Sequence, residues 1–277
     1  MKHRDRIRRE FSRQATFFGG TGLTLSSQEY LDWMVGVLPL NEAFRVLDIA
    51  AGTAHLSQAI APHVREVIAV DMTPAMLEEA RKTILRKGIE NIRLEEGDVR
   101  HLPYADNTFD MVVSRLAVHH FENPDVELCE MVRVCKPGHT VGIIDLLSPD
   151  DETLIERYNH LERLRDLSHT KALTQAQLVD IMKEAGLSIT RIDARNIPVD
   201  FQRWVAMTGA DVKRTTAIRN ELEQELDGGH KTGMRPYRED GRLKFLQVWS
   251  VIIGKKSGSA NSHMTDRRFL STSLVSY

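Results

Sequence analysis

Short apolar segments alternate with helical patterns from Phe44 onward, and this alternation constrains the fold more than any other feature of the chain. Each segment has the length of a strand and is rich in apolar residues, as strands covered by helices on both faces are. They occupy residues 45–49, 66–70, 92–96, 109–114 and 140–146. Parallel strands joined by helices have this rhythm, so the sequence predicts an α/β fold with a Rossmann-like, mostly parallel sheet and helices on both faces.

The organisation changes after Pro149, where a longer and more polar helical stretch over 152–167 interrupts the alternation. Two further strands are expected at 187–192 and 243–253, with an apolar stripe of Phe201, Trp204 and Met207 at helical spacing between them. We therefore predict one domain over 1–254. It comprises an N-terminal helical part (1–43), a ligand-binding half (44–149) and a second half with helical insertions (150–254). Residues 255–277 are predicted to be a tail that is either disordered or appended to the natural chain.

Charge and cysteine usage exclude several classes of protein. The formal net charge is −2, so the chain lacks the general basic field of a nonspecific nucleic-acid binder, and the arginine-rich start is the single local hint of one. Cys129 and Cys135 are too few for a disulfide framework or a cysteine-rich zinc site. No apolar stretch reaches membrane-spanning length, and no secretory signal is apparent. We predict a cytoplasmic location, no metal site and no membrane span.

Three acidic residues stand where predicted strands end. Asp48 lies at the end of the first strand and precedes a turn of small residues, Asp71 ends the second strand, and Asp98 follows the third. Carboxyl ends of parallel strands share one edge of a sheet, which is where such folds bind their ligands. Each aspartate alone could be an ordinary turn or cap residue. Together they predict a ligand crevice, and Asp48 argues against a pyrophosphate beside the small-residue turn.

These motifs resemble those of the class I S-adenosylmethionine-dependent methyltransferases, and most of all the type 11 and ubiquinone/menaquinone-methyltransferase-like branch. The resemblance spans about 11–254. Its motifs are Asp48-x-Ala50-x-Gly52-x-Ala54, Asp71-Met72-Thr73-Pro74, Gly97-Asp98, the segment 102–110 and the segment 130–138 with its Lys-Pro-Gly turn. The family implies a seven-stranded sheet whose last strand, here 243–253, runs antiparallel. It also implies S-adenosyl-L-methionine as cofactor and S-adenosyl-L-homocysteine as product.

By this resemblance, each motif residue takes one part of the cofactor. Asp48, Ala50 and Gly52 would surround the methionine moiety, Asp71 would bind the ribose, and Met72 would pack on the adenine. Asp98 and the Val99 backbone would read the adenine amino edge, with Ser114 and Arg115 beside the methyl donor. Ala54 departs from the usual glycine, and its methyl group would weaken binding if this position has a positive φ.

The candidates for a general base are His119 and His120, which follow the fourth strand on the same edge of the sheet. A base is optional, because methyl transfer mainly needs orientation and exclusion of water. Either histidine could instead serve a loop or cap the helix that begins at Pro124. In similar methyltransferases the segment Phe11 to Phe18 folds over the cofactor as a lid, with Gly19 and Gly20 as hinges.

The acceptor is the least determined part of the function. Size and near-neutral charge favour a small-molecule methyl acceptor, whose specificity would reside in 152–170 and 198–242. The alternatives are an RNA or protein methyltransferase, and a catalytically silent S-adenosylmethionine-binding protein. The stripe of Phe201, Trp204 and Met207 is expected to be core or cap packing rather than a substrate cage, although it could equally form the face of a homodimer.

Overall fold

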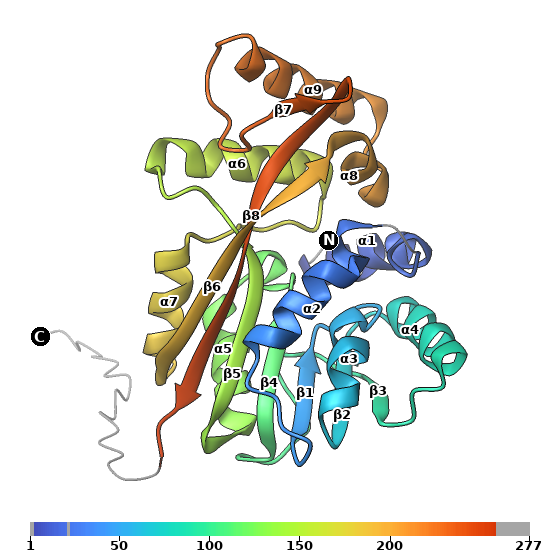
Figure 1. Ribbon diagram of the computed structural model, residues 1–277, viewed down its shortest axis with the longest axis vertical. Coiled ribbons are helices and arrows are strands. Elements are labelled where there is room, and N and C mark those ends of the chain that lie inside the picture. Colours follow the sequence, from blue (N-terminus) through green and yellow to red (C-terminus); the bar gives the residue numbers. More distant parts are fainter. Residues whose placement is uncertain (1–2, 21–22, 259–277) are drawn as a thin grey trace, which may run out of the picture.

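The computed structural model describes residues 3–20 and 23–258, and Figure 1 shows the arrangement of its elements. Within these residues one sheet has the order β3-β2-β1-β4-β5-β8-β6, and a short β7 pairs with β8. The strands are β1 (Arg45–Ile49), β2 (Glu66–Asp71), β3 (Ile92–Glu96), β4 (Phe109–Arg115), β5 (Cys135–Leu147), β6 (Leu187–Asp200), β7 (Tyr237–Glu239) and β8 (Arg242–Lys256). Strands β1 to β5 are parallel, and β8 is antiparallel to β5, β6 and β7.

Alternating side chains of the central strands pack on two different layers of helices, which confirms the predicted fold class. Val46 and Met111 belong to the core with α2 (Gln28–Val37) and α3 (His55–Ile60), and α4 (Pro74–Lys87) covers β2 and β3 on that face. Leu47 and Val112 face α5 (Pro124–Val134) and α7 (Gln175–Glu184). Full burial of each such side chain contributes about 1.5–3 kcal/mol, so both faces of the sheet are committed to packing.

The strands differ from the prediction at four main places, and the first is that β5 begins at Cys135 rather than at residue 140. The segment 237–239 was not expected as a strand, so the sheet has eight strands among the described residues rather than seven. Strand β6 continues to Asp200, because β8 pairs with it along a polar stretch that has no strand pattern of its own. Strand β8 continues through Lys256, two residues into the predicted tail. The rest of that predicted tail, 259–277, lies outside the described residues.

A helical cap stands above the carboxyl edge of the sheet. It consists of α6 (Glu152–Arg165), α8 (Phe201–Thr208) and α9 (Val212–Leu226), and β6 and β8 run up into it from the sheet (Figure 1). Asp151, Asp200 and Asp211 each accept a backbone N–H bond at the start of one of these helices, as N-cap residues do. The predicted insertions are therefore helices that cover one edge of the sheet.

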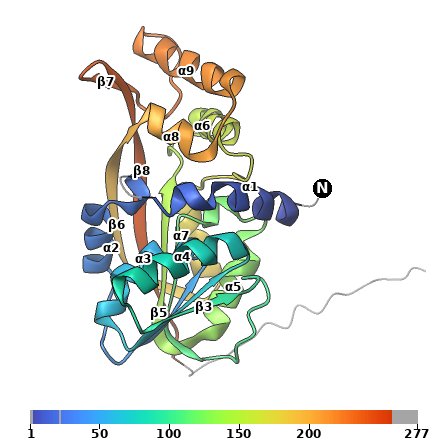
Figure 2. The same cartoon turned by 90° about the vertical axis from the view of Figure 1, so that its right-hand side faces the viewer.

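The N-terminal helix α1 (His3–Phe18) passes between this cap and the sheet, with α8 on one side and α4 on the other (Figure 2). One-turn 3-10 helices follow at η1 (Thr24–Ser26), η2 (Ala61–His63) and η3 (Val118–His120). None of the helices in the described part of the chain is long and apolar enough to cross a membrane. The carboxyl edge of the sheet is thus enclosed by α1 and the cap.

Candidate active site

The turn after β1 is built from residues in the left-handed region. Ala50, Gly52 and Ala54 have φ values of 49°, 56° and 58°, and α3 begins directly after Ala54. Left-handed geometry is natural for Gly52 but strained for the two alanines, so the condition set for Ala54 in the sequence analysis is met. A Cβ at Gly52 would meet no protein atom within 4 Å. The turn therefore leaves open space beside its backbone.

Asp71 at the end of β2 is fixed by two backbone bonds. Its Oδ2 accepts from the Gly52 amide and its Oδ1 from the Thr73 amide, both at 2.8 Å. Burial raises its pKa above the ordinary value, and the two amide bonds oppose that rise. Because a carboxylate has about four acceptor positions, Asp71 can still accept hydrogen bonds from a ligand. It joins the two turns that follow β1 and β2.

A cavity opens at this edge of the sheet between the two turns and α1. Its empty volume, including the open mouth, is about 1070 Å³, which is at the upper end for small-molecule sites. Its wall combines the turn after β1, the ends of β2 and β3, the residues after β4, and α1. Seven of the nine cofactor residues implied by the resemblance line it: Ala50, Gly52, Asp71, Met72, Asp98, Val99 and Arg115.

Asp48 and Ser114 do not line this cavity, in contrast to what the resemblance implies. Asp48 lies behind the turn, 1 % exposed, where its Oδ2 accepts a 2.5 Å bond from the Ser57 hydroxyl of α3. Its Oδ1 has no hydrogen-bond partner. Burial raises the pKa of Asp48 to about 7. The side chain of a strand residue alternates between faces, and position 48 turns toward α3 rather than along the strand into the cavity.

Asp98 lines the cavity but is already paired. Its carboxylate accepts two side-chain bonds from Arg100, at 3.0 and 2.7 Å, and lies 3.5 Å from Arg4 of α1. These Arg100 bonds hold its pKa at about 2. Arg8 likewise pairs with Glu96 at the end of β3. Arginines of the N-terminus thus contact acidic residues of the site, which gives the arginine-rich start an intramolecular role.

Arg115 is a partly buried cation at the end of β4. Its Nη2 donates to the Leu25 carbonyl at 2.6 Å, and its guanidinium lies 5.9 Å from the Trp249 ring centroid. Burial lowers its pKa to about 10, with Asp48 and Asp145 opposing the fall. Arg115 therefore places a positive charge on the wall of the cavity that Asp71 also lines.

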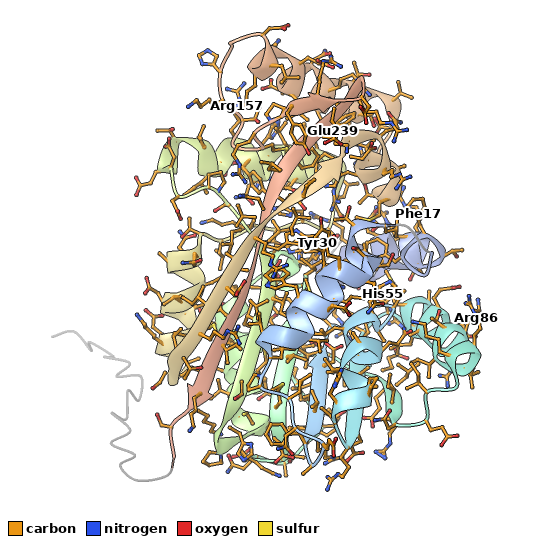
Figure 3. The ribbon with its side chains drawn as sticks, viewed as in Figure 1. Phe17, Tyr30, His55, Arg86, Arg157 and Glu239 are labelled. Atoms are coloured by element: carbon orange, nitrogen blue, oxygen red, sulfur yellow. The ribbon has the colours of Figure 1, made fainter. Side chains whose placement is uncertain are left out.

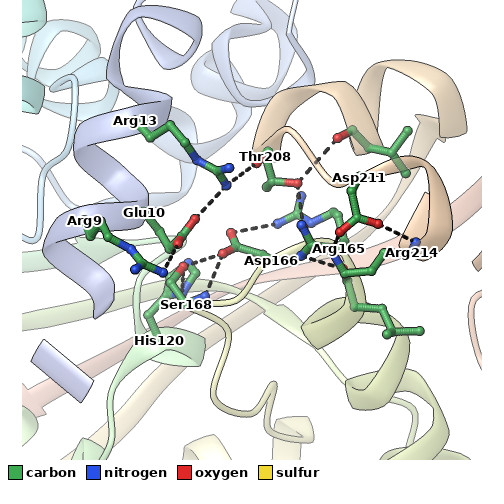
Figure 4. Close-up of polar contacts among 12 residues, drawn as sticks. Arg9, Glu10, Arg13, His120, Arg165, Asp166, Ser168, Thr208, Asp211 and Arg214 are labelled. Carbon is green, nitrogen blue, oxygen red and sulfur yellow. Dashed lines mark hydrogen bonds and ion pairs between the residues drawn. The ribbon is translucent and has the colours of Figure 1, made fainter. Parts of the chain in front are cut away.

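The two candidate histidines differ in their partners. His119 donates through Nδ1 to Oδ1 of Asp145 on β5, at 2.5 Å, and its ring is 4.1 Å from that of His120. His120 has its Nδ1 3.2 Å from the Ser168 hydroxyl, which in turn donates to Asp166. Burial lowers the pKa of His120 well below its usual value. Figure 4 shows this Ser168 link beside α1.

A second cavity adjoins the first, under the cap. Its empty volume is about 700 Å³, and five residues line both cavities: Phe11, Phe18, Leu25, Leu116 and His120. His119 lines only the second, together with Trp204, Met207 and Trp249. Phe201 is instead 1 % exposed and packs in the core, with its ring centroid 6.3 Å from that of Trp204. The predicted apolar stripe is thus partly core and partly cavity wall.

Several lining residues were not predicted from the sequence. His3, Arg4 and Ile7 reach the first cavity from α1, and Glu127 reaches it from α5. His55 at the start of α3 also lines it, and its Nε2 donates to the Phe18 carbonyl at 2.9 Å (Figure 3). For α1 the available signal was the apolar spacing of Ile7, Phe11 and Phe18. Glu127 and His55 carry no such signal.

Among the residues that the structure describes, no three His, Cys, Asp or Glu side chains gather where they could hold a metal ion. The histidines are instead engaged with carboxylate, hydroxyl and ring partners.

Known proteins resemble this chain along most of its length. The family described as a methyltransferase domain matches residues 46–138. An uncharacterized methyltransferase of Bacillus subtilis, YcgJ, is 31 % identical over 225 residues, which cover 81 % of this chain and 89 % of that protein. Its crystal structure superposes with a TM-score of 0.76 at 30 % identity and covers 84 % of this chain and 100 % of the other.

Two further matches agree. A putative methyltransferase from Bacillus halodurans superposes with a TM-score of 0.75 at 26 % identity, covering 83 % of this chain and 99 % of that structure. The ubiquinone/menaquinone biosynthesis C-methyltransferase UbiE of Idiomarina loihiensis is 34 % identical over 124 residues, which cover 43 % of this chain and 49 % of UbiE. With its sheet order, its rim of lining residues and a relative that matches along four fifths of its length, the chain belongs to the class I S-adenosylmethionine-dependent methyltransferases.

Proposed function

We propose that the first cavity binds S-adenosyl-L-methionine and that the second cavity holds a small-molecule methyl acceptor. The observation that carries the proposal is Asp71, a carboxylate with spare acceptor positions, on the wall of a large cavity beside the open turn at Gly52. When bound, the cofactor supplies a methyl group on a sulfonium that leaves as a neutral thioether. The residues present fit such a group.

Each part of the cavity wall suits one part of the cofactor. Asp71 accepts hydrogen bonds from ribose hydroxyls, and Met72, Ile7 and Phe11 supply apolar surface for the adenine ring. Arg115 offers a partly buried positive charge to the methionine carboxylate. Asp98 reads the adenine amino edge only if Arg100 shares it. The helix α1 supplies one wall of the cavity, and closure of that wall over a bound cofactor would exclude water from the site.

A small acceptor is supported by the second cavity. Its walls are largely apolar and lie between α1 and the cap. It adjoins the first cavity at His120 and the four other residues that line both cavities. An RNA or protein acceptor would call for an exposed basic or extended binding face. Arg4, Arg8 and Arg13 instead pair with acidic residues of the same chain. A cytoplasmic location and a homodimer remain predictions.

Titration calorimetry with S-adenosyl-L-homocysteine tests the cofactor site. Asp71→Asn removes one carboxylate acceptor while keeping the size of the side chain, and we expect at least tenfold weaker binding. Glu66→Gln is the matched control, since Glu66 lies at the other end of the same strand and pairs with Arg45. Equal affinity of wild type and Asp71→Asn would contradict the placement. Tritiated-methyl transfer from S-adenosyl-L-methionine to small acceptors then separates an enzyme from a silent binder.

A further inference from the structure

His119 is held in one orientation by Asp145. The Asp145 carboxylate accepts from the His119 ring Nδ1 at 2.5 Å, from the His119 backbone amide at 3.2 Å and from the Leu146 amide at 2.7 Å. Three bonds fix this carboxylate, and a proton on Nδ1 leaves the lone pair on Nε2. No described residue hydrogen-bonds Nε2, and His119 lines the second cavity. The pair has the arrangement by which a carboxylate orients a histidine as a proton acceptor.

Two histidine rings lie beside that of His119. The rings of His120 and His169 lie 4.1 and 5.4 Å from it, and burial lowers the pKa of both, so both stay neutral near pH 7. His169 donates through Nε2 to Asn159 and lines neither cavity. His119 therefore has a carboxylate as its hydrogen-bond partner and two uncharged histidine rings beside it.

The second cavity also carries a loosely held cation. Arg165 lines it, is 6 % exposed and stacks 5.0 Å from the Trp204 ring centroid. The polar contacts of its side chain among the described residues are long: 3.5 Å from Nη2 to Asp166, which Figure 4 shows, and 3.6 Å from Nε to Glu162. Its Nε and the Trp204 Nε1 have no hydrogen-bond partner. A buried guanidinium with donors to spare favours an oxygen acceptor on a ligand.

We propose that the second cavity selects a flat, largely apolar acceptor with an acidic hydroxyl group, a phenol or an enol, and that His119 takes the proton of that hydroxyl. The inference rests on the proposed function. Trp204, Trp249 and Phe11 supply surface for a planar ring, and Arg165 stabilises the negative oxygen. Asp166 lines the same cavity and lies 3.5 Å from Arg165, so the discrimination between acceptors rests on the hydroxyl proton that His119 takes.

The proposed methyl transfer balances in protons and electrons without another reagent. The O–H bond breaks toward His119 Nε2, whose lone pair takes the proton, and the O–H electron pair stays on oxygen. That oxygen forms the new bond to the methyl carbon as the sulfur–carbon bond breaks and its pair remains on sulfur. His119 is left as an imidazolium beside Asp145 and returns the proton to solvent after product leaves.

A pair of matched probes tests this inference without relying on turnover. 4-Nitrophenol and 4-nitroaniline have nearly the same shape, and the first alone has an acidic hydroxyl whose anion is coloured. With S-adenosyl-L-homocysteine present, we expect wild type to bind the phenol at least tenfold more tightly than the aniline by calorimetry. We also expect the bound phenol to show the anion colour at a pH where the free phenol does not.

Variants then assign the effect. In His119→Asn the preference for the phenol should fall to within about twofold and the anion colour should disappear, whereas His169→Asn should retain both. If His119→Asn does not fold, Asp145→Asn replaces it, because loss of the Asp145 carboxylate should also abolish the phenol preference and the anion colour. Binding of S-adenosyl-L-homocysteine should be unchanged in all three.

The outcomes separate the two proposals. Loss of S-adenosyl-L-homocysteine binding by the wild type would be a failure of the proposed function. Intact cofactor-product binding with equal affinity for both probes, with no binding of either probe, or with a phenol preference that survives His119→Asn would overturn the inference.

Discussion

The Arg13 guanidinium of α1 donates a 2.9 Å hydrogen bond to the Thr208 carbonyl at the end of α8, joining residues 195 positions apart (Figure 4). The same Nη2 is 2.6 Å from Oε2 of Glu10, a carboxylate that is 3 % exposed. Because α1 forms one wall of both cavities and α8 belongs to the cap, this bond ties the helix over the first cavity to the wall of the second.

Removing this tie should speed release of the cofactor product. Arg13→Ala deletes a hydrogen bond that contributes about 0.5–1.5 kcal/mol, so we expect dissociation of S-adenosyl-L-homocysteine to be about 2- to 10-fold faster in stopped-flow measurements. Arg9→Ala is the control, since Arg9 also pairs with Glu10 but has no bond to α8 among the described residues. Identical dissociation rates for the two variants would show that the bond does not hold α1 closed.

The two strained alanines should respond differently to glycine. Ala50 is partly exposed, and replacing it by glycine removes the strain of its left-handed conformation. Because glycine also makes the unfolded chain more flexible, the net increase in the free energy of unfolding should be about 0.5–1 kcal/mol. Ala54 has the same strain, but it is fully buried against Ala69 and Ala80, and loss of its methyl group costs about 0.8 kcal/mol.

Ala54→Gly should therefore be nearly neutral or slightly destabilising in chemical denaturation. A larger stabilisation by Ala54→Gly than by Ala50→Gly would contradict this balance of strain and packing.

Asp48 should make stability depend on pH. Burial raises its pKa to about 7 from an ordinary value of 3.8, so the folded protein binds this proton more tightly than the unfolded chain. Its contribution to stability is full below about pH 4 and is lost as pH rises toward 7. Asp48→Asn has no such pH-dependent loss. In urea unfolding, the free energy of unfolding of Asp48→Asn minus that of the wild type should therefore rise by about 2 kcal/mol between pH 5 and pH 8.

Asp110→Asn provides the contrast. Burial alone would raise the pKa of Asp110, but bonds from Lys136 and the Arg45 amide hold it below the ordinary value. Its destabilisation should therefore be constant from pH 5 to pH 8. A flat pH profile for Asp48→Asn would show that Asp48 is ionised throughout this range.

The last residues of β8 should matter for stability. Lys256 Nζ donates to the Val132 and Cys135 carbonyls at 2.7 and 2.8 Å, at the end of α5, and to Asn107. Lys256→Ala should lower the free energy of unfolding by about 1–2 kcal/mol, because carbonyls at a helix end lose a cationic donor. The exposed Lys255 is the matched control, and Lys255→Ala should change stability by less than about 0.5 kcal/mol. Equal effects of the two variants would contradict the capping role.

The sequence determined the parallel sheet and its ligand edge. Buried strands read as apolar runs and helices as 3.6-residue patterns, so the strand at 45–49 and the helix at Pro74 could be placed from local periodicity. Asp71 could be placed at the cavity for the same reason, since the end of a parallel strand defines its edge, whereas Met72 was assigned through the family resemblance. These features depend on residues that are close together in the chain.

Only the tertiary structure decided which side chains meet across the chain. Asp48 faces α3, and Asp98 pairs with Arg100 and with Arg4 of α1. The residues around Asp48 and Asp98 do not show which helix each side chain will meet, because that depends on how α3 and α1 pack on the sheet. The polar end of β6 became a strand through pairing with β8. His119 and Asp145 are 26 residues apart and become partners only because β4 and β5 are neighbours in the sheet. Local pattern fixes elements and their ends, whereas contacts between distant side chains arise from the packing of those elements.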